Sequence, residues 1–148
     1  MKRLLTLSIL IGALFPAVHN EETGWYWKQS TLQAFYFIEA ENLLVDGAPI
    51  EEGDVVGAFT SEGVCAGFEV YDGGAVSTVP IMGNDQSEGF ENYPFIGDPI
   101  FVRVFDASEG DDTTPNTQNG VLPLDLSGGE FDHGDGSWGI SELYTFIG

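Results

Sequence analysis

Cysteine, basic residues and histidine are scarce in this sequence. Its 148 residues include one Cys, two His and only four Lys and Arg in total. A single Cys cannot form an internal disulfide, and one Cys with so few His disfavours a closed zinc site. Binding to nucleic acid or to an anionic membrane needs clustered cations, which the chain lacks. The composition therefore excludes a disulfide-stapled fold and predicts no nucleic-acid partner.

Long apolar runs are also absent, except for one at the N-terminus. Lys2 and Arg3 precede an apolar stretch over residues 4–15, which is too short to span a bilayer and has the length of a signal-peptide core. The alternative is a buried N-terminal helix. We expect residues 1–20 to be a signal peptide, cleaved between Ala17 and Glu22. The mature protein is then secreted, to the extracellular space or the cell surface, with no membrane insertion after signal removal.

Acidic and aromatic side chains, by contrast, are abundant. Asp and Glu number 24, the formal net charge is −20, and Lys28 and Arg103 are the only Lys and Arg beyond the predicted signal peptide. Such acidity is typical of a disordered tail, but 43% hydrophobic and 13% aromatic residues are enough to bury a core. The length fits a single domain, which we place at residues 21–148.

Short runs of β-branched and aromatic residues recur along the mature chain, separated by Gly, Pro, Asn and Asp. Val64, Ala66, Phe68 and Val70 alternate with the residues between them, which is typical of half-buried antiparallel strands. No segment has convincing helical periodicity. We therefore predict an all-β fold, an antiparallel β-sandwich of Ig-like or jelly-roll-like type with about eight strands. The predicted strands cover residues 32–40, 42–45, 55–60, 64–71, 75–81, 100–106, 121–124 and 142–147.

Residues suited to catalysis are few. His19 lies within the predicted signal peptide, so His133 is the histidine of the mature chain, and no Ser stands in a Gly-x-Ser-x-Gly context. Cys65 lies within a predicted strand, where we expect a buried and inert thiol. With so many acidic residues, a carboxylate pair at glycosidase spacing is expected by chance. We predict that the protein is not an enzyme.

Clusters of acidic, amide and hydroxyl side chains beside Gly indicate a hard cation. Ca²⁺ takes about six to eight oxygen ligands, and Gly lets a loop curl around the ion. None of the clusters matches an EF-hand loop, and the alternative is that they are solvated turns. We expect Ca²⁺ as the cofactor. Its candidate ligands are Asp132 and Asp135, Asn84, Asp85 and Glu88, and Asp111 and Asp112.

Two aromatic segments lie near the ends of the mature chain. Trp25, Tyr26 and Trp27 stand at one end, and Tyr144 and Phe146 stand at the other. In a strand, Trp25 and Trp27 face one side and Tyr26 faces the other. We predict that these five residues bind a partner. The alternative is that both ends pair within their own sandwich and contribute to its core.

Five short motifs follow one another along most of the mature chain. They are a Trp followed by an aromatic strand at 27–37, Gly-Asp-x-Val-Gly-Ala-Phe at 53–59, Gly-x-Cys-x-Gly at 63–67, Pro-x-Met-Gly-Asn-Asp at 80–85 and Phe-Val-Arg-Val-Phe-Asp-Ala-Ser at 101–108. In this order they resemble an extracellular β-sandwich module of secreted, cell-surface and matrix proteins of bacteria. The resemblance implies a non-catalytic module, usually repeated or attached to larger proteins. Here the module stands alone, which favours self-assembly.

The terminal segments lead to our expectation about function. Strand edges carry unpaired backbone groups, and these apolar segments lack the charge or Pro that normally blunts an edge. We expect an exported structural subunit whose partners are copies of itself, assembled into an extracellular filament, sheath or surface layer. Residues 21–33 are the candidate donor strand. The alternative is a non-catalytic carbohydrate-binding or adhesion module that binds glycans through Trp25, Trp27 or Trp138.

Overall fold

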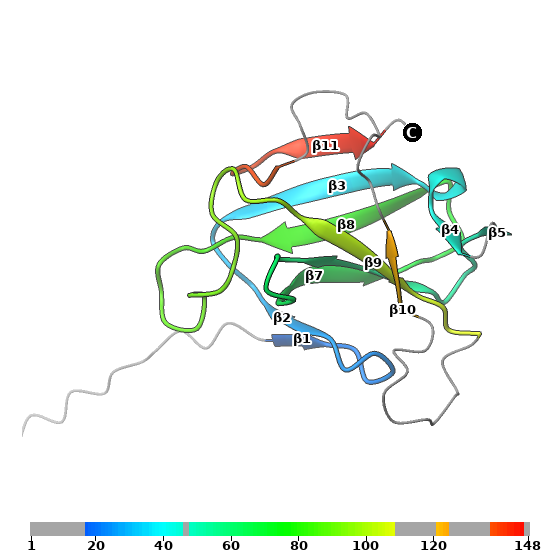
Figure 1. The fold of residues 1–148 in the computed structure, drawn as a ribbon, viewed down its shortest axis with the longest axis horizontal. Helices are drawn as coiled ribbons and strands as arrows, with labels where there is room; N and C mark the ends of the chain where they lie inside the picture. Colours follow the sequence, from blue (N-terminus) through cyan, green and yellow to red (C-terminus); the bar gives the residue numbers. More distant parts are fainter. Residues whose placement is uncertain (1–16, 46–47, 109–120, 125–136, 147–148) are drawn as a thin grey trace, which may run out of the picture.

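The computed structural model describes residues 17–45, 48–108, 121–124 and 137–146. Apart from one short 3₁₀ helix, η1 (Ala40–Asn42), its regular structure is β-strand, which confirms the all-β prediction. The strands are β1 (Ala17–His19), β2 (Tyr26–Lys28), β3 (Gln33–Glu39), β4 (Leu44–Val45), β5 (Ala48–Pro49), β6 (Val55–Phe59), β7 (Cys65–Val70), β8 (Val76–Met82), β9 (Phe101–Phe105), β10 (Val121–Leu124) and β11 (Leu143–Phe146) (Figure 1).

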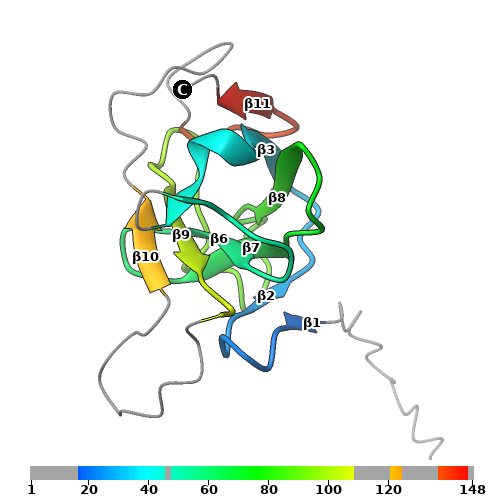
Figure 2. The same ribbon diagram turned by 90° about the vertical axis from the view of Figure 1, so that its right-hand side faces the viewer.

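Two sheets form the body of a β-sandwich-like fold (Figures 1 and 2). One sheet has the strand order β10-β9-β6-β7, and the other has the order β11-β3-β8. Two further pairs, β1-β2 and β4-β5, lie outside these sheets. Every strand segment predicted from the sequence overlaps an observed strand, and β2 lies within the candidate donor strand at residues 21–33, whereas β1 and β5 were not predicted.

One strand departs from the predicted antiparallel arrangement. β11 runs parallel to β3, with Leu143 opposite Phe35 and Phe146 opposite Ile38. Antiparallel neighbours can be joined by a tight hairpin, whereas parallel strands need a long connection. Because β3 and β11 lie far apart in the sequence, no hairpin fixes their relative direction. Among the described strand pairs, β11-β3 is the one parallel pair in a fold that is otherwise antiparallel, as predicted.

The core lies between the two sheets. The register places Val56 and Ala58 of β6 opposite Val104 and Val102 of β9, and all four side chains are buried. The other sheet contributes buried side chains from β3 and β8, which are Tyr36, Ile38, Val79 and Ile81. The alternation of buried and more exposed residues along β3 and β9 follows the period of two that the sequence indicates.

The two sheets approach each other closely where β7 passes β8. A Cβ atom on Gly67 would lie 1.6 Å from the Pro80 carbonyl oxygen, so only glycine allows this approach. The Glu69 carboxylate accepts hydrogen bonds from the Thr78 N–H at 2.7 Å and from the Ser77 hydroxyl. Gly67 and Glu69 therefore lie on the face of the four-stranded sheet that points into the core.

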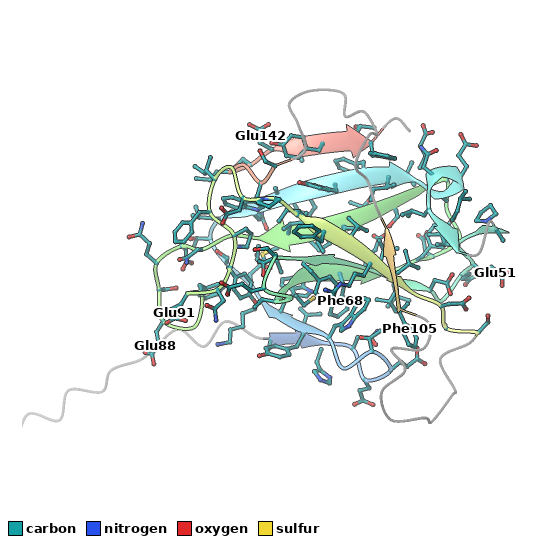
Figure 3. The ribbon with its side chains drawn as sticks, in the orientation of Figure 1. Glu51, Phe68, Glu88, Glu91, Phe105 and Glu142 are labelled. Atoms are coloured by element: carbon teal, nitrogen blue, oxygen red, sulfur yellow. The ribbon has the colours of Figure 1, made fainter. Side chains whose placement is uncertain are left out.

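The outer face of the same sheet is also apolar. The register places Gly57 and Phe59 on this face together with Phe68 and Phe105. Phe68 and Phe105 lie on the side of the sheet toward the β1-β2 hairpin (Figure 3), and the hairpin runs below the sheet in Figure 1. The hairpin thus adds a partial third layer, which covers part of a surface that a two-layer sandwich would leave in water.

Candidate binding groove and N-terminal strand edge

Trp25 docks on the outer face of the four-stranded sheet. Its ring meets Phe59 edge to face, with ring centroids 4.9 Å apart and an interplanar angle of 80°. A Cβ atom on Gly57 would lie only 2.7 Å from Trp25 Cζ3. The absence of a side chain at Gly57 therefore leaves the space that the indole occupies. Trp25 belongs to the aromatic segment at 25–27 and Gly57 to the motif at 53–59, and the sequence analysis gave no indication that the two meet.

The next two aromatic residues point in opposite directions, as a strand requires. Trp27 is 8% exposed and belongs to the core, whereas Tyr26 is 57% exposed. The buried Trp27 Nε1 has no hydrogen-bond partner among the described residues. An unsatisfied buried donor lowers the stability of the fold by about 1–3 kcal/mol.

Because Tyr26 is exposed, its side chain is the most available to another molecule among the three N-terminal aromatic residues.

β2 pairs with β1, a strand of three exposed residues. The antiparallel register places Ala17 opposite Lys28 and Val18 opposite Trp27. The Asn20 N–H continues the pairing by donating to the Trp25 carbonyl oxygen at 2.9 Å. On its other side, β2 contacts the loop after β8, because the Lys28 N–H donates to the Tyr93 hydroxyl at 2.9 Å. β1 lies wholly within the range predicted to be signal peptide.

A groove of about 380 Å³ opens beside β2. Three segments line it, namely residues 24–28, the β6–β7 turn at 59–65 and the loop at 89–93. Phe59 and Tyr93 are buried at its base, Trp25 and Lys28 are half-buried, and Tyr26 is exposed. Clefts of this size, lined by aromatic side chains and a few polar groups, are typical of small-ligand sites.

Of the two basic residues of the predicted mature chain, Lys28 lines this groove and Arg103 lies beside it. The Arg103 guanidinium carbon lies 4.5 Å from the centroid of the Phe59 ring, and a Cβ atom on Gly63 would be 3.9 Å from one of its nitrogens. Phe59 and Gly63 both line the groove, as does the acidic residue Glu91. The groove therefore has one cation in its lining and a second beside it, together with one carboxylate.

Local contacts also shift the titration of three groove residues. Burial raises the pKa of Tyr93 and raises the pKa of the Cys65 thiol to about 12. The Cys65 thiol is therefore protonated at neutral pH, as expected of an inert cysteine. The Gly89 N–H donates to the Glu91 carboxylate at 3.0 Å and lowers the pKa of Glu91. Glu91 accordingly presents a carboxylate, and so a hydrogen-bond acceptor, at the rim of the groove.

One of the predicted calcium clusters lies in the described part of the chain. The Asn84 side chain accepts from the Gln86 N–H at 2.8 Å, and the Asp85 carboxylate accepts from the Ser87 N–H at 3.0 Å. Glu88 lies on the same loop, which also carries Glu91 (Figure 3). Among the described residues, no group of three or more His, Cys, Asp or Glu side chains is placed to hold a metal ion. Calcium binding stays a prediction.

The other two predicted clusters, Asp111 with Asp112 and Asp132 with Asp135, lie outside the described residues, as does His133.

The aromatic residues near the C-terminus contribute to the core of their own domain. Tyr144 and Phe146 of β11 are 6% and 5% exposed, and Tyr144 meets Tyr36 edge to face at 5.3 Å. Trp138 is fully buried, and its Nε1 donates to the Ile81 carbonyl oxygen at 3.2 Å. For Tyr144 and Phe146, burial in the chain's own core is the alternative that the sequence analysis left open. Trp138, which was named there as a possible glycan contact, is buried as well.

Sequence reasoning identified Trp25 and Tyr26 but missed the rest of the groove. Phe59 and Gly63 come from one segment and Tyr93 from another, and no local pattern indicates where these segments meet β2. One signal was available, because Lys28 and Arg103 are the only Lys and Arg beyond the predicted signal peptide.

The fold and the groove define the class of this protein as a β-sandwich-like, all-β protein with a partial third layer over one face. No known family, curated protein or solved structure matches the chain. No helix within the described ranges has the length and apolar character needed to cross a membrane.

Proposed function

We propose that this protein is an exported structural subunit that assembles with copies of itself, through its N-terminal segment, into an extracellular filament, sheath or surface layer. One observation carries the proposal: the strand that pairs with β2 lies within the predicted signal peptide. β1 covers Ala17–His19, and predicted cleavage falls between Ala17 and Glu22. Loss of residues 1–20, the predicted signal peptide, removes the whole of β1 and leaves β2 with an open edge.

The uncovered edge has the chemistry that strand addition needs. Loss of Asn20 frees the Trp25 carbonyl oxygen, and loss of Val18 removes the backbone opposite Trp27. A strand of a neighbouring copy can bond to these groups and extend the sheet. When the donated strand and the accepting edge are different surfaces, the contact does not close on itself and generates a filament.

The length of the chain before β2 provides the test. We compare the mature chain that begins at Glu21 with a chain that begins at Ala17 and so retains β1. The Glu21 form should form large particles by light scattering and filaments by negative-stain electron microscopy, whereas the Ala17 form should remain monomeric under the same conditions. Equal behaviour of the two forms, whether both assemble or both stay monomeric, contradicts the proposal.

A second candidate function is glycan binding by a monomeric adhesion module. The observation in its favour is the groove of about 380 Å³, whose lining includes Trp25, Tyr26 and Tyr93. It predicts that tryptophan fluorescence changes when saccharides are added to the mature chain. A fluorescence signal that no saccharide alters counts against it.

A further inference from the structure

We infer that the groove beside β2 binds an acidic saccharide, meaning a sugar unit that carries a carboxylate. This inference rests on the second candidate function, and it narrows the ligand class of that function. It does not depend on strand addition, because the groove lies on the side of β2 that faces the loop at 89–93, opposite the edge that β1 covers. Both activities can therefore reside in one molecule.

The shape and surface of the groove suit a sugar ring. Its volume of about 380 Å³ is at the small end of the range for ligand sites. Phe59 and Tyr93 form an apolar base, and the Trp25 ring stands at the side, held by its edge-to-face contact with Phe59. Rigid aromatic faces pack against the C–H faces of a sugar, and a phenolic hydroxyl such as that of Tyr26 supplies a polar partner beside them.

The charge of the groove selects for an anion. Lys28 and Arg103 are the only Lys and Arg beyond the predicted signal peptide, and the structure places Lys28 in the lining of the groove and Arg103 beside it, against the Phe59 ring. The lining also carries the Glu91 carboxylate, and the rest of the predicted mature chain is strongly acidic, so Lys28 is the group that can pair with an anion here. A neutral sugar leaves these two neighbouring cations without a role, whereas the carboxylate of an acidic sugar can bond to the Lys28 ammonium group.

One glycine keeps room for the Lys28 ammonium group. A Cβ atom on Gly89 would lie 2.5 Å from Lys28 Nζ, so the ammonium group occupies space that a side chain at 89 would take. Glu91 and Asn92 stand exposed at the rim, where their oxygen and nitrogen atoms can bond to sugar hydroxyls.

An acidic peptide is the competing ligand, and the backbone geometry disfavours it. An extended peptide binds a strand edge through main-chain hydrogen bonds. On the groove side of β2, the Lys28 N–H already donates to the Tyr93 hydroxyl at 2.9 Å. A peptide there would have to displace Tyr93, whereas a saccharide needs only the side chains that line the groove.

The test uses the full mature chain and three probes of matched size: tri-galacturonic acid, the neutral trisaccharide maltotriose, and a tri-glutamate peptide. Binding is followed by titration calorimetry and by tryptophan fluorescence. We expect tri-galacturonic acid to bind and the other two probes not to bind. Lys28→Gln should weaken binding by about tenfold or more, since it removes a charged hydrogen bond, and Lys28→Arg should restore most of the affinity. Matching thermal melts check that both variants are folded.

Each contrary result overturns the inference in a distinct way. If maltotriose binds as tightly as tri-galacturonic acid, the groove does not select for a carboxylate, although the protein still binds a glycan. Tighter binding of tri-glutamate identifies a peptide site instead. Binding of no probe, or binding that Lys28→Gln leaves unchanged, removes the groove as an acidic-saccharide site. None of these results bears on filament formation by the Glu21 form.

Discussion

Replacing Gly57 with Ala should undock Trp25 from the four-stranded sheet. The new Cβ atom would lie 2.7 Å from Trp25 Cζ3 and 2.8 Å from Phe59 Cε2. Non-bonded carbon atoms prefer separations of about 3.5–4.0 Å, so both rings have to move. The edge-to-face contact between them, at 4.9 Å, would be lost or strained.

The size of the effect follows from three contributions. Inserting a methyl group into a packed site costs about 1–3 kcal/mol, and loss of an aromatic pair costs about 0.5–1.5 kcal/mol. Replacing Gly with Ala within a strand also stabilises the folded state by about 0.5–1 kcal/mol, because Gly loses more backbone entropy on folding. We expect Gly57→Ala to lower the free energy of unfolding by about 2 kcal/mol, the middle of a range of about 0.5–4 kcal/mol. For a domain of this size the melting temperature would then fall by about 3–10 °C.

A double-mutant cycle isolates the contact with Trp25. Urea unfolding followed by circular dichroism gives the cost of Gly57→Ala alone and in a chain that already carries Trp25→Ala. Without the indole, most of the clash is absent, so Gly57→Ala should cost about 1 kcal/mol less in the second chain. The same cost in both chains would show that Trp25 does not pack on Gly57, and the docking of the N-terminal segment described above would be wrong.

Three further predictions concern the ion, the sheet junction and pH. Millimolar Ca²⁺ should raise the melting temperature well beyond the effect of matched ionic strength, since a hundredfold excess over Kd stabilises by about 2.7 kcal/mol; identical melting in Ca²⁺ and in EDTA would exclude the ion. Gly67→Ala should cost more than about 3 kcal/mol or prevent folding, because its Cβ meets backbone at 1.6 Å. Gly53→Ala, with φ of 105° but open space around its Cβ, should cost only about 1–2 kcal/mol, and equal thermal melts of the two variants would contradict the steric account. Hydrogen bonds from Ser87, first from its side chain, lower the pKa of Asp85 from 3.8 to about 2. The stabilisation from these bonds is complete above pH 3.8 and is lost as the pH falls toward 2, so the stability difference between wild type and Asp85→Ala should shrink over that interval; a difference that stays constant would show that this carboxylate is not involved.

The strands of the two sheets were largely predictable because their signal is local. Along β9, Val102 and Val104 are buried and Phe101 is exposed, and this period of two is visible in the sequence itself. The direction of β11 was not predictable, because it depends on where a distant segment meets β3 in space. Strand β1 and its pairing with β2 were missed for a different reason, since residues 17–19 belong to a segment that looks like the end of a signal peptide.

The candidate site was less predictable than the fold. The sequence indicates that Trp25 and Trp27 share a face of a strand, but it does not indicate which surface that face meets. The answer depends on Gly57, more than 25 residues away, whose missing side chain admits Trp25. The groove likewise depends on contacts among three separate segments, and such contacts leave no periodic pattern in the sequence.

The short connection between β1 and β2 favours β1 over any strand of another molecule that could pair with the same edge of β2. β1 is tied to β2 by a turn of a few residues, and strands joined by so short a tether meet at an effective concentration in the millimolar range. A neighbouring copy present at micromolar concentration would therefore compete for the β2 edge at a disadvantage of about a thousandfold. Even a strand of three exposed residues can hold the edge under these conditions. If the predicted signal peptide is removed, this local excess disappears, and occupancy of the edge then depends on the concentration of any competing strand.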